Sequence, residues 1–470
     1  METNETRIER DSMGEMPVPA SAYYGASTMR AVLNFPISGL RLPRAFIRAL
    51  GQIKLSAAYA NAELGLLEPE AADAIQRAAR EVADGVLDAE FVVDVFQTGS
   101  GTSTNMNANE VIANRASELL TGNRQRRVVH PNDHVNLCQS SNDVIPSAIR
   151  VAALQLTRDE LEPALADLQA ALAAKAEEFW DVLKTGRTHL QDATPVRLGQ
   201  EFRGYAAQVD RAARRLASAA DELSELPLGG TAVGTGINCH PGFPAAAIAK
   251  LREVTGLHLR ETPEHFQAQN NIDALVAASS ALRTLALGLM KIADDIRWMG
   301  SGPRAGIGEL ALPEVQPGSS IMPGKVNPVI CESLLQACAQ VLGNDATLVV
   351  AARDSHFELN MMLPVAGYNL LQSISLLAAA VRNFTSRCVT GLRATTRGPD
   401  LVASGLAIAT ALAPKLGYDA AARIAKEAAA TGETILEAAL RLTDLPEAEL
   451  RAALDPAALV EPGLGFGGGG

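Results

Sequence analysis

Five polar and glycine-rich segments interrupt the long apolar stretches of this sequence. They combine glycines with Ser, Thr, Asn, His and Lys side chains, which bind ligands or move protons, and they span residues 98–107, 130–143, 186–192, 229–236 and 318–328. Backbone N–H groups become available where helices are interrupted, so such segments are common places for function. We therefore look for the chemistry of the protein among these five segments.

The segment 318–328 has the strongest chemical pattern. Ser319 and Ser320 lie between two glycines, and Lys325 and Asn327 precede Pro328, which favours the first turn of a helix. A helix N-terminus attracts anions, while a lysine adds a full charge and an asparagine a directional donor. The segment could therefore hold a carboxylate and stabilise further negative charge during a reaction. A surface loop that only caps a helix is the alternative.

His189 lies in a polar break between Thr188 and Leu190. A single histidine is more often a structural hydrogen-bonding group than a catalyst. Helix packing could bring it close to Ser319, Lys325 and a candidate partner acid, Glu332, which favours the catalytic interpretation.

Other ligand sites have weaker patterns. Gly324-Lys325 is followed by Val326, so no phosphate-binding G-x-x-x-x-G-K-[ST] motif occurs. The glycines of residues 229–236 are too loosely spaced for a dinucleotide fingerprint, and a tight connection between helices explains them. His130 and His134 have no third ligand at metal-site spacing, so we expect no metal.

The elements that must position these segments are mainly helices. Leu161, Leu165, Leu168 and Leu172 step by four, three and four residues, which places them on one helix face, and Pro163 would begin or kink that helix. Similar periodicity continues in 202–216 and 275–296, and residues 329–350 and 360–382 are equally helix-like. Three or more such helices predict a bundle. Strand signals are short and sparse.

Composition shifts along the chain suggest domain boundaries. We expect an N-terminal domain over residues 1–139, where the chain is choppier, and a central helical bundle over 140–395. Shorter helices over 419–431, 434–441 and 447–454 predict a small C-terminal domain at 396–462, and residues 463–470 read as a disordered glycine-rich tail.

Composition excludes several classes of protein. The chain has 470 residues, 53 of them acidic and 41 basic, so its net charge of −12 gives no general attraction to nucleic acid or to anionic membranes. Five cysteines without a CxxC pair argue against a disulfide framework and a zinc site. There is no signal peptide pattern and no run of 18 apolar residues, so we expect a cytoplasmic protein without a membrane span.

The segment 318–328 resembles the signature of the fumarase/aspartase superfamily, and the resemblance covers nearly the whole chain. Within it, residues 130–133 and 186–192, with Gly324, are similar to the iron-independent class II fumarate hydratases. Aspartate ammonia-lyases usually carry Gln at the position of His189 and Ala at that of Gly324. The class II family usually has Ser at the position of Cys138.

The resemblance implies a mainly α, three-domain fold with a central long-helix bundle. It implies a homotetramer with a twenty-helix core, in which three subunits build each active site. The implied reaction is the reversible hydration of fumarate to L-malate in the tricarboxylic acid cycle, through an aci-carboxylate carbanion and without metal or organic cofactor. Ammonia addition to fumarate, and a catalytically silent structural protein, are the alternatives.

The resemblance also implies residue roles. Ser319 would remove the C3 proton of malate, while His189, oriented by Glu332, would activate or protonate the water added at C2. Lys325 and Asn327 would bind the carboxylate beside the carbanion. Further substrate contacts would come from Ser100, Gly101, Thr102, Ser140, Ser141, Asn142, Thr188, Ser320 and Val326. A second anion site would be formed by Arg127, His130, Pro131, Asn132 and Asp133.

Overall fold

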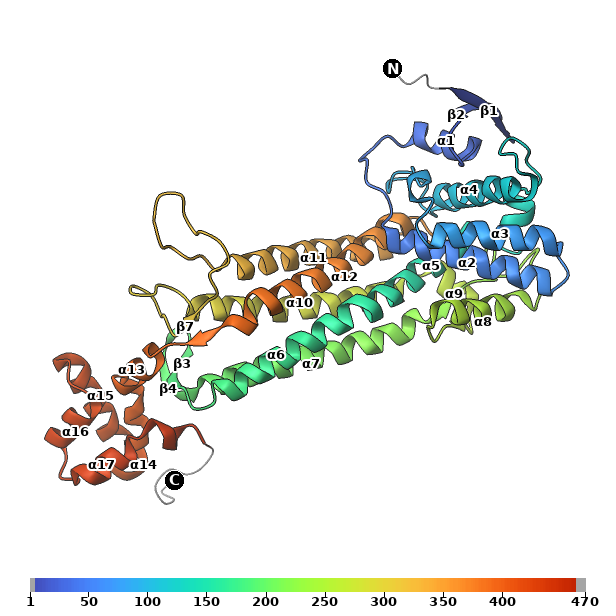
Figure 1. The fold of residues 1–470 in the computed structure, drawn as a ribbon. Helices are drawn as coiled ribbons and strands as arrows, with labels where there is room; N and C mark the ends of the chain where they lie inside the picture. The colour runs from blue at the N-terminus through green and yellow to red at the C-terminus, as the bar shows by residue number, and fades with distance from the viewer. Residues whose placement is uncertain (1–4, 462–470) are drawn as a thin grey trace. The chain divides into compact units, whose positions relative to one another are not determined.

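The computed structural model describes residues 5–461, and the residues placed in it are mainly helical (Figure 1). The tail expected over 463–470 lies outside the described residues. Within these, the chain forms two compact units: the residues up to Pro163 with Ala212–Ala286 and Ala337–Ala379, and Ala164–Arg211 with Leu287–Gln336 and the residues from Ala380 onward. The boundaries of the three predicted domains stay a prediction.

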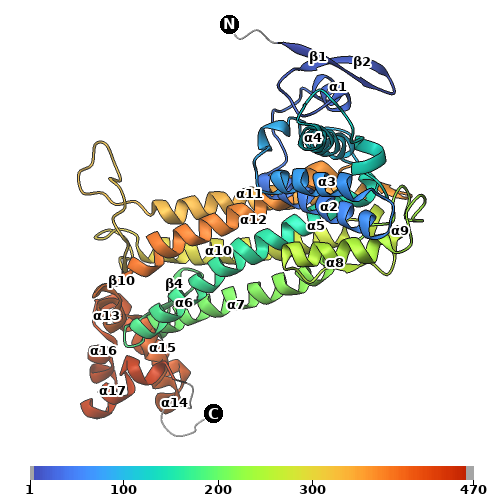
Figure 2. The same ribbon diagram turned by 45° about the vertical axis from the view of Figure 1, so that its right-hand side comes forward.

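The first unit contains a stack of helices at its N-terminal side. Its elements up to residue 156 are β1 (Thr6–Asp11), β2 (Gly14–Pro19), α1 (Ala26–Asn34), α2 (Arg44–Glu63), α3 (Pro69–Ala83), α4 (Thr102–Thr121) and α5 (Ser141–Leu156). The two strands form an antiparallel hairpin. Helix α2 packs against α3, α5 and α8 (Phe243–Thr255), and α3 also packs against α4 (Figures 1 and 2). Helix α9 (His265–Asn270) and the short strands β5 (Glu225–Leu226), β6 (Arg260–Glu261), β8 (Ser355–His356) and β9 (Leu359–Asn360) complete this unit.

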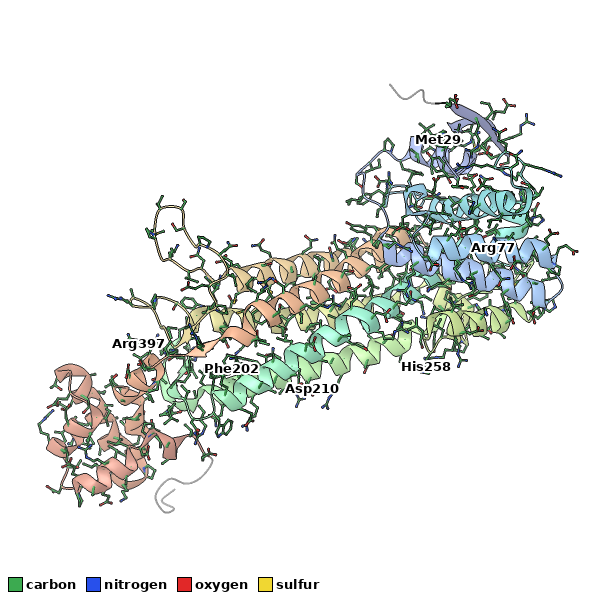
Figure 3. The ribbon with its side chains drawn as sticks, viewed as in Figure 1. Met29, Arg77, Phe202, Asp210, His258 and Arg397 are labelled. Atoms are coloured by element: carbon green, nitrogen blue, oxygen red, sulfur yellow. The ribbon has the colours of Figure 1, made fainter. Side chains whose placement is uncertain are left out.

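Long helices follow the periodicity of the sequence. They are α6 (Glu162–Glu178), α7 (Leu198–Leu223), α10 (Asp273–Met299), α11 (Val329–Arg353) and α12 (Leu363–Arg387), and each contributes residues to both units. The four leucines predicted to share one face, from Leu161 to Leu172, are all buried. Pro163 is the second residue of α6, directly after a π-turn that continues α5, so the prediction that this proline begins or kinks the helix is confirmed. Phe202, labelled in Figure 3, is fully buried against Phe179.

The second unit also contains short strands and the C-terminal helices. A hairpin joins β3 (Leu183–Thr188) to β4 (Gln191–Arg197), and β7 (Leu310–Ala311) pairs with β10 (Arg393–Ala394). The last helices are α13 (Arg397–Ala403), α14 (Ala413–Leu416), α15 (Tyr418–Thr431), α16 (Ile435–Leu442) and α17 (Glu447–Ala453). Helices α15, α16 and α17 match the three predicted C-terminal helices to within a residue at each end. They bury a common apolar cluster that includes Ile424, Ile435 and Leu450.

The N-terminal part of the chain is more regular than its sequence suggests. The polar segment 98–107, which we expected to interrupt the helices, continues from residue 102 into α4, a helix of 20 residues. Its asparagines are buried, and their amide groups donate to neighbouring segments. Helix propensity is overridden here by tertiary hydrogen bonds.

Three helices are long and apolar enough to cross a membrane by length and composition: Asp273–Met299, Val329–Arg353 and Leu363–Gly391. None of the three is an uninterrupted apolar run, because charged and polar residues occur in each. In the apolar stretch of each helix, only 39–56% is buried within the chain. Exposed residues such as Leu287, Val349 and Val350 leave an apolar surface on these helices that has no cover in the single chain.

Candidate active site

Two helix N-termini of the first unit meet at a chain of hydroxyl groups. Ser100 Oγ lies 2.7 Å from Thr102 Oγ1, which in turn lies 2.7 Å from Ser141 Oγ. Gly101 caps α4 with φ +75°, and a Cβ there would lie 2.9 Å from Ile145 Cγ2, so glycine allows α4 and α5 to begin side by side. The structure thus brings two predicted substrate-binding segments together.

A capping box fixes the beginning of α5. The Ser140 hydroxyl accepts the N–H of Asn142, and the Asp143 carboxylate accepts the N–H of Ser140 at 2.9 Å. The other oxygen of Asp143 accepts the N–H groups of Gly229 and Thr231 at 2.9 and 3.0 Å. The fully buried Asp143 therefore ties the glycine-rich segment 229–236 to the helix N-terminus, and burial raises the pKa of this carboxyl.

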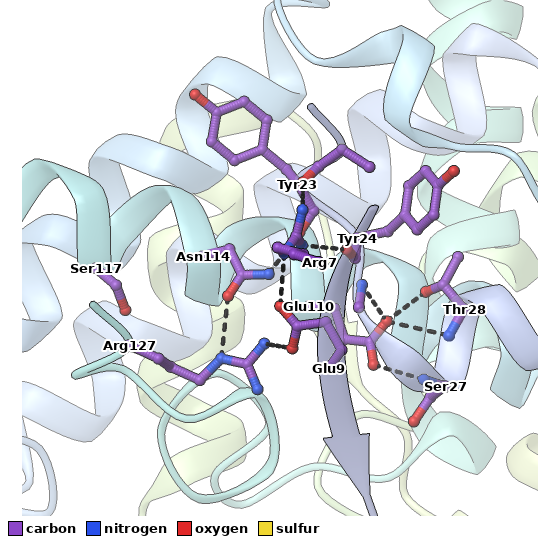
Figure 4. Close-up of polar contacts among 12 residues, drawn as sticks. Arg7, Glu9, Tyr23, Tyr24, Ser27, Thr28, Glu110, Asn114, Ser117 and Arg127 are labelled. Carbon is purple, nitrogen blue, oxygen red and sulfur yellow. Dashed lines mark hydrogen bonds and ion pairs between the residues drawn. The ribbon is translucent and has the colours of Figure 1, made fainter. Parts of the chain in front are cut away.

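The candidate second anion site has partners within the chain. Arg127 donates through Nε to Asn114 Oδ1 at 3.1 Å and forms an ion pair with Glu9 of β1 (Figure 4). His130 caps a single π-turn, Pro131–Val135, by accepting the N–H groups of Asn132 and Asp133 on Nδ1. The anion-binding role of this segment stays a prediction.

The segment 318–328 is a closed loop in the second unit. Its two ends are joined because Gly318 N–H donates to Lys325 O at 2.9 Å and Asn327 Nδ2 donates to Gly318 O at 2.7 Å. The half-buried Ser319 hydroxyl accepts the N–H groups of Ile321 at 3.2 Å and Met322 at 3.0 Å. The side chains of Ser320, Lys325 and Val326 are exposed. Helix α11 begins at Val329, directly after Pro328, as predicted.

His189 lies at the tip of the β3–β4 hairpin. Thr188 pairs with Gln191, so His189 and Leu190 are the two residues of the turn, with φ values of +56° and +59°. Two positive values are typical of a type I′ turn, which normally selects Asn-Gly. Leucine rarely adopts this backbone conformation, so the hairpin holds His189 outward at a cost in strain.

Glu332 lies in the first turn of α11, and in this single chain no hydrogen bond joins the described side chains of His189 and Glu332. The orientation of His189 by Glu332 therefore stays a prediction about the assembled protein. Within residues 5–461 no group of three or more His, Cys, Asp or Glu side chains is placed to hold a metal ion.

Sequence reasoning missed the polar cluster behind the two helix N-termini. Lys54, on α2, is fully buried and donates to Asn136 Oδ1 and Gln139 Oε1. The signal that could have revealed it is a lysine between Ile53 and Leu55 in an otherwise apolar helical run. A lysine at such a position is almost never fully buried without a specific partner.

Comparisons with known proteins identify the family of the chain. A family model described as Lyase matches residues 14–343, and one described as Fumarase C C-terminus matches residues 408–461. The chain is 51% identical over 460 residues to fumarate hydratase class II 2 of Bradyrhizobium diazoefficiens, covering 97% of both chains. It is 53% identical over 459 residues to fumarate hydratase class II of Halobacterium salinarum, covering 97% of this chain and 98% of the relative.

Solved structures show the same fold. The crystal structure of recombinant class II fumarase from Schistosoma mansoni has a TM-score of 0.94 and 39% identity, and covers 96% of this chain and 98% of that one. The structure of a fumarate lyase:delta crystallin from Brucella melitensis bound to cobalt has a TM-score of 0.92 and 46% identity, with 97% and 100% coverage. By these matches over nearly its full length, the chain belongs to the class II fumarase family of lyases.

Proposed function

We propose that this protein is a fumarate hydratase that interconverts fumarate and L-malate. The observation that carries the proposal is the similarity to relatives named fumarate hydratase class II, which are 51–53% identical to this chain over 97% of its length. The local geometry supports it, because the chain offers paired helix N-termini and a serine loop to a dicarboxylate.

The first unit supplies an anion-binding surface. The N-termini of α4 and α5 carry Ser100, Thr102 and Ser141 as a hydrogen-bonded chain, and hydroxyl groups can donate to a carboxylate oxygen. Positive helix ends favour negative charge close to their first turn. These features support binding of one substrate carboxylate here.

The loop 318–328 supplies the base. A serine hydroxyl is a weak base, so it must lose its proton in an environment that stabilises the oxyanion. Two backbone N–H groups already point at Ser319 Oγ, from Ile321 and Met322, which supports Ser319 as the group that takes the C3 proton of malate. Lys325 and Asn327 would then hold the carboxylate that becomes doubly negative.

His189 would handle the water at C2. Its exposed position at a strained turn supports a role outside its own chain, because residues held in unusual backbone conformations cluster at functional sites. In a tetramer whose sites are shared by three subunits, His189 and Glu332 can meet the helix N-termini of other copies. The uncovered apolar surface of α10 and α11 supports such an assembly.

The assembly and the location are tested separately. Sedimentation of the purified protein should give four times the subunit mass of 49.4 kDa, and a monomer would remove the shared-site proposal. We propose a cytoplasmic location, for which fractionation of cells should recover the activity in the supernatant rather than with membranes.

The activity is tested by following the ultraviolet absorbance of fumarate after protein is added, with and without ammonium. Loss of absorbance without ammonium, with L-malate as product, is the expected result. Loss that requires ammonium, with aspartate as product, would contradict the proposal and identify an ammonia-lyase.

A further inference from the structure

Lys54 is a charged side chain at the centre of a buried polar cluster. Its Nζ donates to Asn136 Oδ1 at 2.9 Å and to Gln139 Oε1 at 3.0 Å, and its side chain has no solvent exposure. Both acceptors are neutral amides. Burial lowers the pKa of Lys54 to about 7, although the charge of Asp143 acts in the opposite direction.

The two amides fold the preceding loop around the ammonium group. Asn136 Nδ2 donates to Gln139 O at 3.1 Å, and Gln139 Nε2 donates to Val135 O and Leu137 O at 3.1 and 3.0 Å. Each amide therefore uses its nitrogen to shape the loop and its oxygen to bind Lys54. The loop ends at Gln139, whose next residue is Ser140, the N-cap of α5.

The same cluster reaches the other helix N-terminus. Asn136 Oδ1 also accepts from Asn105 Nδ2 and Asn109 Nδ2, each at 3.2 Å, and both asparagines lie in the first half of α4. A single amide oxygen thus joins Lys54 on α2 to α4 and to the loop before α5. The hydroxyl chain from Ser100 to Ser141 spans the same two helices.

We infer that Lys54 is a positioning residue: its buried ammonium sets the N-termini of α4 and α5 against each other and adds positive charge behind the surface that binds the substrate carboxylate. This inference rests on the proposed function. It explains why a lysine occupies a volume where an apolar side chain would avoid the cost of a buried charge.

Several charged or titratable groups lie on the elements packed around Lys54. Asp143 on α5 is the group whose charge acts on it, α5 also carries the buried Arg150, and the π-turn packed on α2 carries Asp133 and His134. In the loop between Asn136 and Gln139, a hydrogen bond with Cys239 lowers the pKa of Cys138 to about 6. The buried residues of α3 and α8, which also pack on α2, include no charged side chain. Loss of the proton from Lys54 changes the charge behind the site near neutral pH, and the Lys54→Met variant separates this change from the titration of Cys138.

The test compares Lys54→Met with the wild type and with Ser56→Ala as a matched control. Ser56 is equally buried on α2, but its hydroxyl donates to Gln52 O of its own helix rather than to the loop before α5. We expect Lys54→Met to raise the KM for fumarate about tenfold or more, with a smaller change in kcat. The wild-type KM should rise from pH 6 to pH 9, and this rise should be absent in Lys54→Met and kept in Ser56→Ala.

A folded Lys54→Met protein with wild-type KM and pH profile would overturn the inference. If that variant does not fold, Gln139→Leu decides, because it keeps the lysine and removes one of its two acceptors; a wild-type KM in this variant also overturns the inference. Calorimetric binding of succinate gives the same comparison without turnover. A wild type that binds succinate but does not hydrate fumarate would refute the proposed function. The role of Lys54 would then be decided by the succinate affinity of Lys54→Met relative to the wild type.

Discussion

Replacing Asp143 by asparagine tests whether the N-terminus of α5 positions the substrate. The wild-type carboxylate is fully buried and accepts three backbone N–H groups, from Ser140 on one oxygen and from Gly229 and Thr231 on the other. Asparagine has the same shape but one oxygen. One side of the group must therefore present an NH2 to a backbone donor.

The least costly arrangement keeps the oxygen on Gly229 and Thr231 and turns the amide nitrogen toward Ser140. It loses one charge-assisted hydrogen bond, worth about 1.5–3 kcal/mol, and leaves a buried N–H without an acceptor, at a cost of about 1–3 kcal/mol. Burial raises the pKa of Asp143, so removal of its charge recovers part of this cost. We expect a net loss of about 2–4 kcal/mol in the free energy of unfolding. The KM for fumarate should rise as well, because the lost bond is the one that fixes Ser140.

Urea denaturation at a fixed subunit concentration measures the first effect and steady-state kinetics the second. Glu110→Gln is the matched control, because Glu110 is also buried and accepts the N–H groups of Gly25, Ser27 and Thr28 (Figure 4). The control should lose similar stability and keep its KM. An Asp143→Asn protein that loses stability but keeps the wild-type KM would refute the positioning role of α5.

Four further predictions follow from single residues. Ser319→Ala should lower kcat by about 10²–10⁴-fold at unchanged oligomeric size, and near-normal turnover would remove Ser319 from the mechanism. His189→Asn should slow hydration strongly but change the unfolding free energy by less than about 1 kcal/mol, since His189 is exposed. Leu190→Gly should remove the backbone strain at this positive φ and stabilise the protein by about 1 kcal/mol in urea denaturation. A loss of stability would contradict the conclusion that the turn is strained. Between the folded pKa of about 7 and the ordinary lysine pKa of 10.5, Lys54 binds fewer protons in the native protein than in the unfolded chain. The unfolding free energy of the wild type relative to Lys54→Met should therefore rise with pH over this range in urea denaturation, by at most about 1.4 kcal/mol per pH unit.

The helices could be predicted because their signals are local. The leucine spacing between residues 161 and 172 and the proline at 328 each act within a turn or two of the chain, and both predictions are confirmed. The three C-terminal helices were found to within a residue at each end for the same reason. The beginning of α4 was missed because its polar residues are satisfied by partners distant in sequence, as Asn105 is by Asn136.

The site was predictable as a set of segments but not as an arrangement. The segments containing Ser319 and Ser140 were identified from composition and resemblance, whereas the N–H groups that point at Ser319 Oγ depend on how the loop closes. The positive φ values at His189 and Leu190 could not be predicted either, because Leu190 is a residue type that normally avoids them. Lys54 was missed because its role depends on packing between three helices.

The most direct test of the central claim is a proton NMR spectrum of fumarate incubated with the protein in D2O. Hydration predicts L-malate with one deuterium at C3 and the oxygen at C2, formed in buffer that contains no ammonium. Unchanged fumarate, or conversion only after ammonium is added, would contradict the assignment of this chain as a fumarate hydratase.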